Sequence, residues 1–218
     1  GALVREGRSA EPMRVLSLDH PDLQEHRERY ARLMGCEPGG DFVILPPPAD
    51  KAERFERMLG PAMKLMRDAA PALADEFDVL PDQLVLVPGE ERNGYQFDGG
   101  SCYMLWGALF LNIGIERSPV ALIEVLAHES AHMLLYGFAA EEPLVLNDDD
   151  ERYRSPLRID ERPMDGIYHA TYVSARMHWM MSRLIDSGRL EAAARDEAEA
   201  APRADARNFA ARDEEVRQ

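Results

Sequence analysis

The residues with the clearest chemical potential lie in one short segment, His128-Glu129-Ser130-Ala131-His132. Two histidines four residues apart lie about 40° apart around a helix, so both imidazoles can reach one metal ion. Glu129 projects to the side, where it can contact a metal-bound water or a substrate. The alternative is a pair of ordinary histidines on an amphipathic helix, but unpaired imidazoles are costly among residues as apolar as these. We therefore predict a metal site on this helix.

A third ligand is needed, because two histidines alone bind a metal ion weakly. In a metzincin, Gly and His follow the second motif histidine at fixed steps, but these positions hold Leu135 and Phe138, which excludes that class. A thermolysin-like site takes a Glu from the next helix, yet residues 166–186 contain no Glu. The third ligand must therefore come from another residue type or another segment.

Two histidines lie on this next helix. His169 is on its first turn, and His178 lies nine residues further, about half a revolution away, so only one of the two can face the site. We predict that His169 is the third ligand. Acids of the connection between the two helices remain open as alternatives: Glu141, Glu142 and the run 148–151.

An arginine on the second helix is a candidate for binding an anion. Arg176 follows His169 by seven residues and lies on nearly the same helical face. A guanidinium two turns from a metal ligand is placed to bind a carboxylate through two hydrogen bonds. The alternative is a salt bridge to one of the many acids of this chain.

Three segments together resemble a known family. They are His128 to His132, the nine residues Ser155-Pro156-Leu157-Arg158-Ile159-Asp160-Glu161-Arg162-Pro163, and the helix start Gly166-Ile167-Tyr168-His169-Ala170-Thr171-Tyr172-Val173. They are similar to HExxH-motif peptide-modification proteins, whose members act as iron- and 2-oxoglutarate-dependent β-hydroxylases of ribosomally made peptides. The similar region spans roughly residues 118–185, under a third of the chain. The second segment is much more specific than the HExxH motif.

The resemblance implies a set of site residues. Iron(II) would be held by His128, His132 and His169, with Glu129 orienting substrate rather than acting as an obligatory base. Three histidines depart from the two histidines and one carboxylate that non-haem iron oxygenases commonly use.

The same resemblance implies an arginine that binds 2-oxoglutarate. Arg158 and Arg162 belong to the family-like segment of the connection, whereas Arg176 has the geometric argument given above. Arg158 and Arg162 have a structural alternative, in which they hold the long connection in place together with Asp160. The identity of this arginine therefore stays open among three residues.

The predicted function is that of an iron(II)/2-oxoglutarate-dependent oxygenase that hydroxylates a side-chain β-carbon of a ribosomally synthesised precursor peptide. The alternative is a zinc-dependent peptidase, with Glu129 as general base and the stretch Leu109 to Ile113 as an edge strand that aligns the peptide. A non-catalytic binding role is the third possibility. The lack of a helical Glu, together with Arg176, favours the oxygenase.

The composition excludes some partners. The 218 residues include 40 acids against 25 Lys and Arg, giving a formal net charge of −15, which disfavours nucleic acid and anionic membrane surfaces. Two cysteines, Cys36 and Cys102, cannot form a disulfide framework, so we expect reduced thiols in a cytoplasmic protein. No apolar run approaches the roughly 18 residues of a membrane-spanning helix, and no signal segment opens the chain.

The elements that must position these residues indicate an α+β fold that is predominantly helical. We expect a single catalytic domain over residues 1–188, with a helical part over 1–80 and a small sheet, including a strand at 83–87, plus the metal helices over 81–188. Ser118-Pro119 is a strong helix start and Gly137 a strong stop. This helix would pack on the sheet and pair with a second one over 166–187, as in zincins. Residues 138–165 would pass over the site, and 189–218 would form a polar helical tail.

Overall fold

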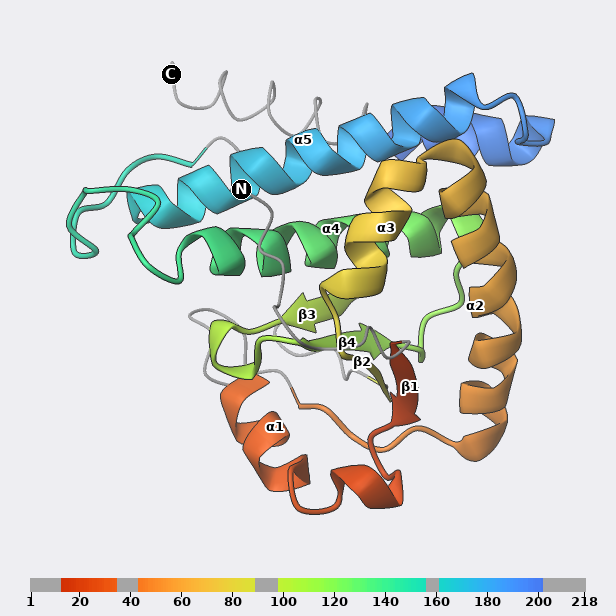
Figure 1. Ribbon diagram of the computed structural model, residues 1–218, viewed down its shortest axis with the longest axis horizontal. Helices are drawn as coiled ribbons and strands as arrows, with labels where there is room; N and C mark the ends of the chain where they lie inside the picture. Colours follow the sequence, from red (N-terminus) through yellow and green to blue (C-terminus); the bar gives the residue numbers. More distant parts are fainter. Residues whose placement is uncertain (1–12, 35–42, 89–97, 156–160, 202–218) are drawn as a thin grey trace.

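The computed structural model describes residues 13–34, 43–88, 98–155 and 161–201 (Figure 1). It is a mixed α/β structure with about 58% helix and one small four-stranded sheet, so the predominantly helical class is confirmed. The strands are β1 (Arg14–Ser17), β2 (Gln83–Val87), β3 (Gly99–Ser101) and β4 (Ala108–Asn112). The α-helices are α1 (Arg27–Met34), α2 (Ala49–Ala69), α3 (Pro71–Val79), α4 (Pro119–Phe138) and α5 (Met164–Asp186). Two 3-10 turns, η1 (Pro21–Leu23) and η2 (Tyr103–Leu105), complete the named elements.

The sheet has the strand order β1-β2-β4-β3. Strands β1, β2 and β4 are parallel, and β3 pairs with β4 in the antiparallel direction at one edge. The prediction that the region up to residue 80 is helical is therefore wrong for residues 14–17. The four residues of β1 are too few to show a period, and their pairing with β2, almost 70 residues later, is invisible to local patterns.

The edge strands of the sheet are β1 and β3, so the assignment of Leu109 to Ile113 as a peptide-aligning edge strand is wrong. Strand β4 lies between β2 and β3, and all five of its residues are buried. A continuous apolar run is typical of a strand covered on both faces, which places it inside a sheet rather than at the edge.

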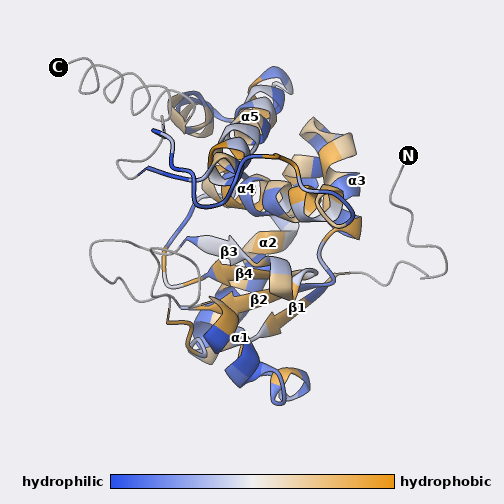
Figure 2. Ribbon diagram, turned by 90° about the vertical axis from the view of Figure 1, so that its left-hand side faces the viewer, coloured by the Kyte–Doolittle hydropathy of each residue, from blue (hydrophilic) through white to orange (hydrophobic). Residues whose placement is uncertain are grey.

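The sheet lies between α4 and α5 on one side and α1 on the other (Figure 2). Side chains alternate in direction along its strands, so the core has two layers. On one face, Leu84, Leu86, Leu109 and Leu111 pack with residues of α2, α3, α4 and α5. On the other face, Val85, Val87 and Phe110 pack with α1 and η2. The larger layer therefore joins the sheet to the helix that carries the HExxH motif.

Helix α4 begins and ends as the sequence predicts. Ser118 is the N-cap, and its Oγ accepts a hydrogen bond of 3.0 Å from the backbone N–H of Ala121. Pro119 occupies the first helical position, where its missing N–H costs nothing. Most of the helix is buried, and α5 packs against it over much of its length (Figure 1).

The described part of the C-terminal segment is helical over residues 192–201. Most of its residues are exposed or half-buried, but Ala198 is fully buried and Leu190 and Ala194 pack on the main core. Its Glu197 also accepts a hydrogen bond of 2.7 Å from Ser118 Oγ at the start of α4. Among the described helices, none has a stretch both long and apolar enough to cross a bilayer.

Candidate functional site

A row of aromatic rings lies along the face of α4 that meets α5. His128, His132 and Tyr136 recur every four residues, with ring centroids 5.0 Å apart for the first pair and 6.3 Å apart for the second. His169, near the start of α5, stacks on His132 with centroids 5.4 Å apart. The structure thus brings the motif histidines together with the histidine that the sequence singles out on the next helix.

The contact between the two helices joins ring nitrogens. His132 Nδ1 and His169 Nδ1 are 3.1 Å apart. Two nitrogen ligands about 2.1 Å from one metal ion, at an angle of roughly 90–110°, lie about 3.0–3.4 Å apart. The same separation suits an N–H···N hydrogen bond, in which one imidazole carries the hydrogen. The pair therefore has the spacing of two adjacent metal ligands. Without a metal ion, the two imidazoles can form a hydrogen bond to each other.

His128 is oriented differently. Its Nδ1 lies 3.2 Å from the sulfur of Met177 on α5, and its Nε2 lies 3.9 Å from Glu129 Oε1. A thioether sulfur only accepts, so this contact is a hydrogen bond only when Nδ1 carries the hydrogen, which leaves the lone pair on Nε2. The nitrogen available for a metal thus faces Glu129.

The three histidines do not converge on one point. Within the described ranges, no three His, Cys, Asp or Glu side chains are grouped as a metal site requires. The donor set therefore fits a metal ion for His132 and His169, and His128 has to turn to join them. The alternative acids, Glu141, Glu142 and the run 148–151, are exposed on the connection.

Burial sets the charge state of these imidazoles. It lowers the pKa of His132 to about 3, with the neighbouring His128 and His169 adding to the effect. Burial also lowers the pKa of His128 and that of His169, against the opposing effects of Asp98 and Asp165. All three rings are consequently neutral at pH 7, which is the form that binds metal ions.

Glu129 is held by the edge strand β3. Its side chain is buried, with 5% of the residue exposed, and its Oε2 accepts a hydrogen bond of 3.0 Å from Ser101 Oγ. Tyr136 donates a hydrogen bond of 3.2 Å to the backbone oxygen of Ser101. A Cβ on Gly99 would lie 2.9 Å from Val125 Cγ1, so only glycine lets β3 approach α4 this closely. Strand β3 therefore orients both Glu129 and the aromatic row.

A cavity of about 360 Å³ opens beside His128 and Glu129. Strand β3 and α4 form its walls, and Met177 of α5 contributes to a third side. Its lining also includes Arg117 and Asp98. This cavity is the space in which a substrate can approach the HExxH motif.

Of the three arginines predicted to bind 2-oxoglutarate, the two that the structure describes, Arg162 and Arg176, do not line this cavity. Arg176 pairs with Glu76 of α3, which is the salt-bridge alternative, and its guanidinium lies 6.0 Å from the ring centres of Tyr172 and Trp179. Arg162 forms an isolated β-bridge with Tyr153 in the connection. Arg158 lies outside the described residues.

Arg117 is the arginine that sequence reasoning missed. Its side chain is 6% exposed, and it donates to the backbone oxygen of Asn112 at 2.5 Å and to Asp98. Its position directly before the Ser-Pro helix start was a usable signal, because that start fixes its place beside the first turn of α4. Tyr136 was also predictable from the sequence, because it follows His132 at the same four-residue spacing. Ser101 was not, because only the pairing of β3 with β4 brings it to Glu129.

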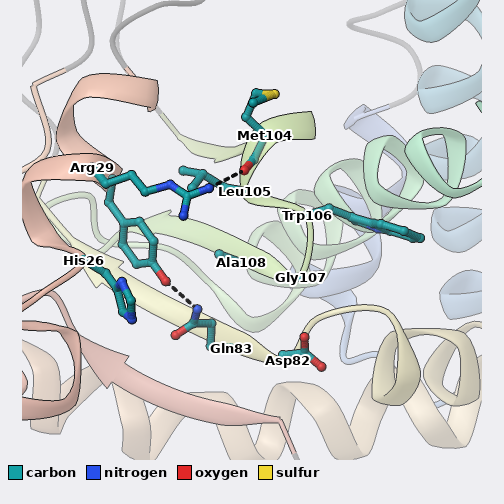
Figure 3. A pocket seen from close by; sticks show the side chains of 10 residues that line it. His26, Arg29, Asp82, Gln83, Met104, Leu105, Trp106, Gly107 and Ala108 are labelled. Atoms are coloured by element: carbon teal, nitrogen blue, oxygen red, sulfur yellow. Dashed lines mark hydrogen bonds between the residues drawn. The ribbon is translucent and has the colours of Figure 1, made fainter. Parts of the chain in front are cut away.

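A second cavity, of about 200 Å³, lies at the amino ends of β2 and β4 (Figure 3). In it, Gln83 donates a hydrogen bond of 2.6 Å to Tyr30, and Arg29 lies 3.5 Å from the backbone oxygen of Met104. Of the predicted site residues that the structure describes, none lines this cavity.

Comparisons with known proteins add no assignment: no protein-family model matches the chain, and no curated protein is significantly similar to it.

Proposed function

We propose that this protein is an iron(II)/2-oxoglutarate-dependent oxygenase that hydroxylates a side-chain β-carbon of a ribosomally made peptide. The observation that carries the proposal is the 3.1 Å approach of His132 and His169, because it joins the HExxH helix to the helix that carries the third family-like segment, residues 166–173. On this proposal, α4 and α5 act as a zincin-like helix pair. We also propose a cytoplasmic location, on the basis of the cysteine content.

His132 and His169 would hold iron(II), and His128 would complete the set through Nε2 after a change of its side-chain torsions. Iron, when bound, supplies the activation of O2 by oxidative decarboxylation of 2-oxoglutarate. The protein's own part is to keep three imidazoles neutral by burial and to fix Glu129 through Ser101. Held in this way, Glu129 faces the cavity and can orient the peptide beside the metal.

A zinc peptidase is the second candidate, and one observation favours it. Glu129 Oε1 lies 3.9 Å from His128 Nε2 at the wall of the cavity, which is where a general base must lie to deprotonate a metal-bound water. The same residues thus serve both reactions, and the difference lies in the metal and the cosubstrate. No Glu of α5 is present to act as a thermolysin-like ligand.

The test is anaerobic addition of iron(II) and 2-oxoglutarate to the metal-free protein. The proposal predicts a weak visible charge-transfer band that disappears on exposure to O2, together with a gain of one oxygen atom in a cognate peptide by mass spectrometry. Absence of the band, with co-purified zinc that supports cleavage of an unmodified peptide, would replace the oxygenase with the peptidase.

A further inference from the structure

The lining of the cavity beside His128 includes an ion pair, Arg117 with Asp98, whose two partners differ in burial. The Arg117 side chain is 6% exposed, whereas the Asp98 side chain is 65% exposed. Arg117 Nη2 lies 2.5 Å from Asp98 Oδ1. A buried guanidinium needs a negative partner, whereas an exposed carboxylate is stable in water without one.

Arg117 is also fixed by backbone groups. Its Nη1 donates to the backbone oxygen of Asn112 at 2.5 Å, and its Nη2 donates to that of Asp98 at 3.2 Å. These bonds come from the end of β4 and from the residue before β3, so they hold the planar group in one orientation. The guanidinium therefore stays in place when the Asp98 carboxylate moves into solvent.

We infer that Arg117 is a carboxylate-binding group and that Asp98 occupies the place of the ligand's carboxylate until a ligand displaces it. The ligand class is a small dicarboxylate or an acidic group of a peptide that reaches along the cavity from His128. Under the proposed function, which this inference deepens, the first source is the distal carboxylate of 2-oxoglutarate.

The charges that line the cavity favour the replacement of the Asp98 carboxylate by a ligand carboxylate over the addition of a further anion. Glu124 and Glu129 also line it, so an added anion would meet two further carboxylates. When a ligand carboxylate replaces that of Asp98, the number of carboxylates at the guanidinium does not change. A neutral ligand would instead leave the buried Arg117 without its ion pair, which makes the cavity selective for an acid.

Two variants have opposite expected effects, which a purely structural pair would not produce. Asp98→Asn removes the competing carboxylate, so it should tighten binding about threefold to tenfold. Arg117→Met should weaken binding at least about tenfold, and Arg117→Lys should weaken it less, because a point charge replaces the planar fork. The matched control is Glu116→Gln, which breaks the exposed Arg54–Glu116 ion pair and should leave binding unchanged.

The probes are 2-oxoglutarate, glutarate and the neutral dimethyl ester of glutarate. Calorimetry on the metal-free protein measures each affinity, and the visible band of the anaerobic iron(II) protein measures that of 2-oxoglutarate. A peptide carrying Glu, compared with the same peptide carrying Gln, tests the second source. Thermal unfolding shows whether each variant folds. When the Arg117 variants do not fold, the carboxylate affinity of Asp98→Asn tests the inference by itself.

The inference is overturned when Asp98→Asn leaves carboxylate affinity unchanged or weakens it, or when folded Arg117→Met binds as the wild type does. The iron(II) protein can instead show the 2-oxoglutarate band with the same affinity in all variants. That result supports the proposed function and contradicts the carboxylate site. The protein can also show no band while its affinity for glutarate or the Glu peptide rises in Asp98→Asn and falls in Arg117→Met. That result supports the carboxylate site and contradicts the proposed function.

Discussion

Two cavities of the described structure lie at opposite ends of the parallel strands and differ in what surrounds them. Beside the larger one, at the carboxyl end of β4, buried histidines have a lowered pKa and face one another across two helices. Beside the smaller one, at the amino ends of β2 and β4, polar side chains bond to their neighbours (Figure 3). Open space is common to both, so the grouping of metal-binding side chains is what distinguishes a candidate site.

The largest expected difference between the two cavities concerns metal binding, and a motif histidine tests it. His132→Ala removes one nitrogen of the pair with His169, so iron(II) affinity should fall at least about a hundredfold. His26→Ala, in the smaller cavity, should leave it unchanged. Metal content after anaerobic reconstitution and desalting measures both, and equal retention by the two variants would contradict the assignment.

A second prediction concerns the hydrogen bond that holds Glu129. Ser101→Ala leaves a buried carboxylate without its 3.0 Å partner, so the free energy of unfolding should fall by about 1.5–3 kcal/mol while the metal is retained. Ser130→Ala is the matched control, because among the described residues the Ser130 hydroxyl bonds a backbone carbonyl of its own helix, at 3.2 Å, and no side chain. Urea denaturation measures both, and a loss for Ser130→Ala as large as that for Ser101→Ala would contradict the role of Ser101.

The fold was predictable where local signals are strong. The Ser-Pro start of α4, the long periodicity of α5 and the apolar run of β2 each predict their elements. Strand β1 was not predictable, because its pairing with β2 joins residues far apart in the chain. The apolar run of β4 did carry a signal for a central strand, which the edge-strand assignment overlooked.

The candidate site was likewise predictable where it depends on spacing within a helix, and not where it depends on strand pairing. Helical spacing alone predicts that His128 and His132 share a face and that one histidine of α5 faces inward. Arg176 shows the limit of that reasoning, because the helical period gives its direction but not the presence of Glu76 on α3. Asp98, Gly99 and Ser101 come to α4 only through the pairing of β3 with β4.

A third prediction tests the close approach of β3 to α4. Gly99→Ala places a Cβ 2.9 Å from Val125 Cγ1, so stability should fall by about 1–3 kcal/mol. Gly60→Ala, on α2 with nothing within 4 Å of the new Cβ, should raise stability by about 0.5–1 kcal/mol. Thermal unfolding of the two variants should therefore shift in opposite directions, and a stabilised Gly99→Ala would show that β3 does not press on α4.

The smallest effect belongs to the smaller cavity. Gln83→Ala removes the 2.6 Å hydrogen bond to Tyr30, which should cost about 0.5–1.5 kcal/mol of stability with no change in metal binding. Chemical denaturation together with metal analysis checks both parts. A loss of metal in this variant would mean that the two cavities are not independent.

The central claim is that a histidine of α5 completes a metal site on α4, and its most direct test compares the two histidines of that helix. His169 stacks on His132, whereas His178, nine residues further along α5, is exposed. Anaerobic iron(II) titration should give His178→Ala the affinity of the wild type and His169→Ala an affinity at least about a hundredfold weaker. Undiminished iron(II) binding by His169→Ala would contradict the account.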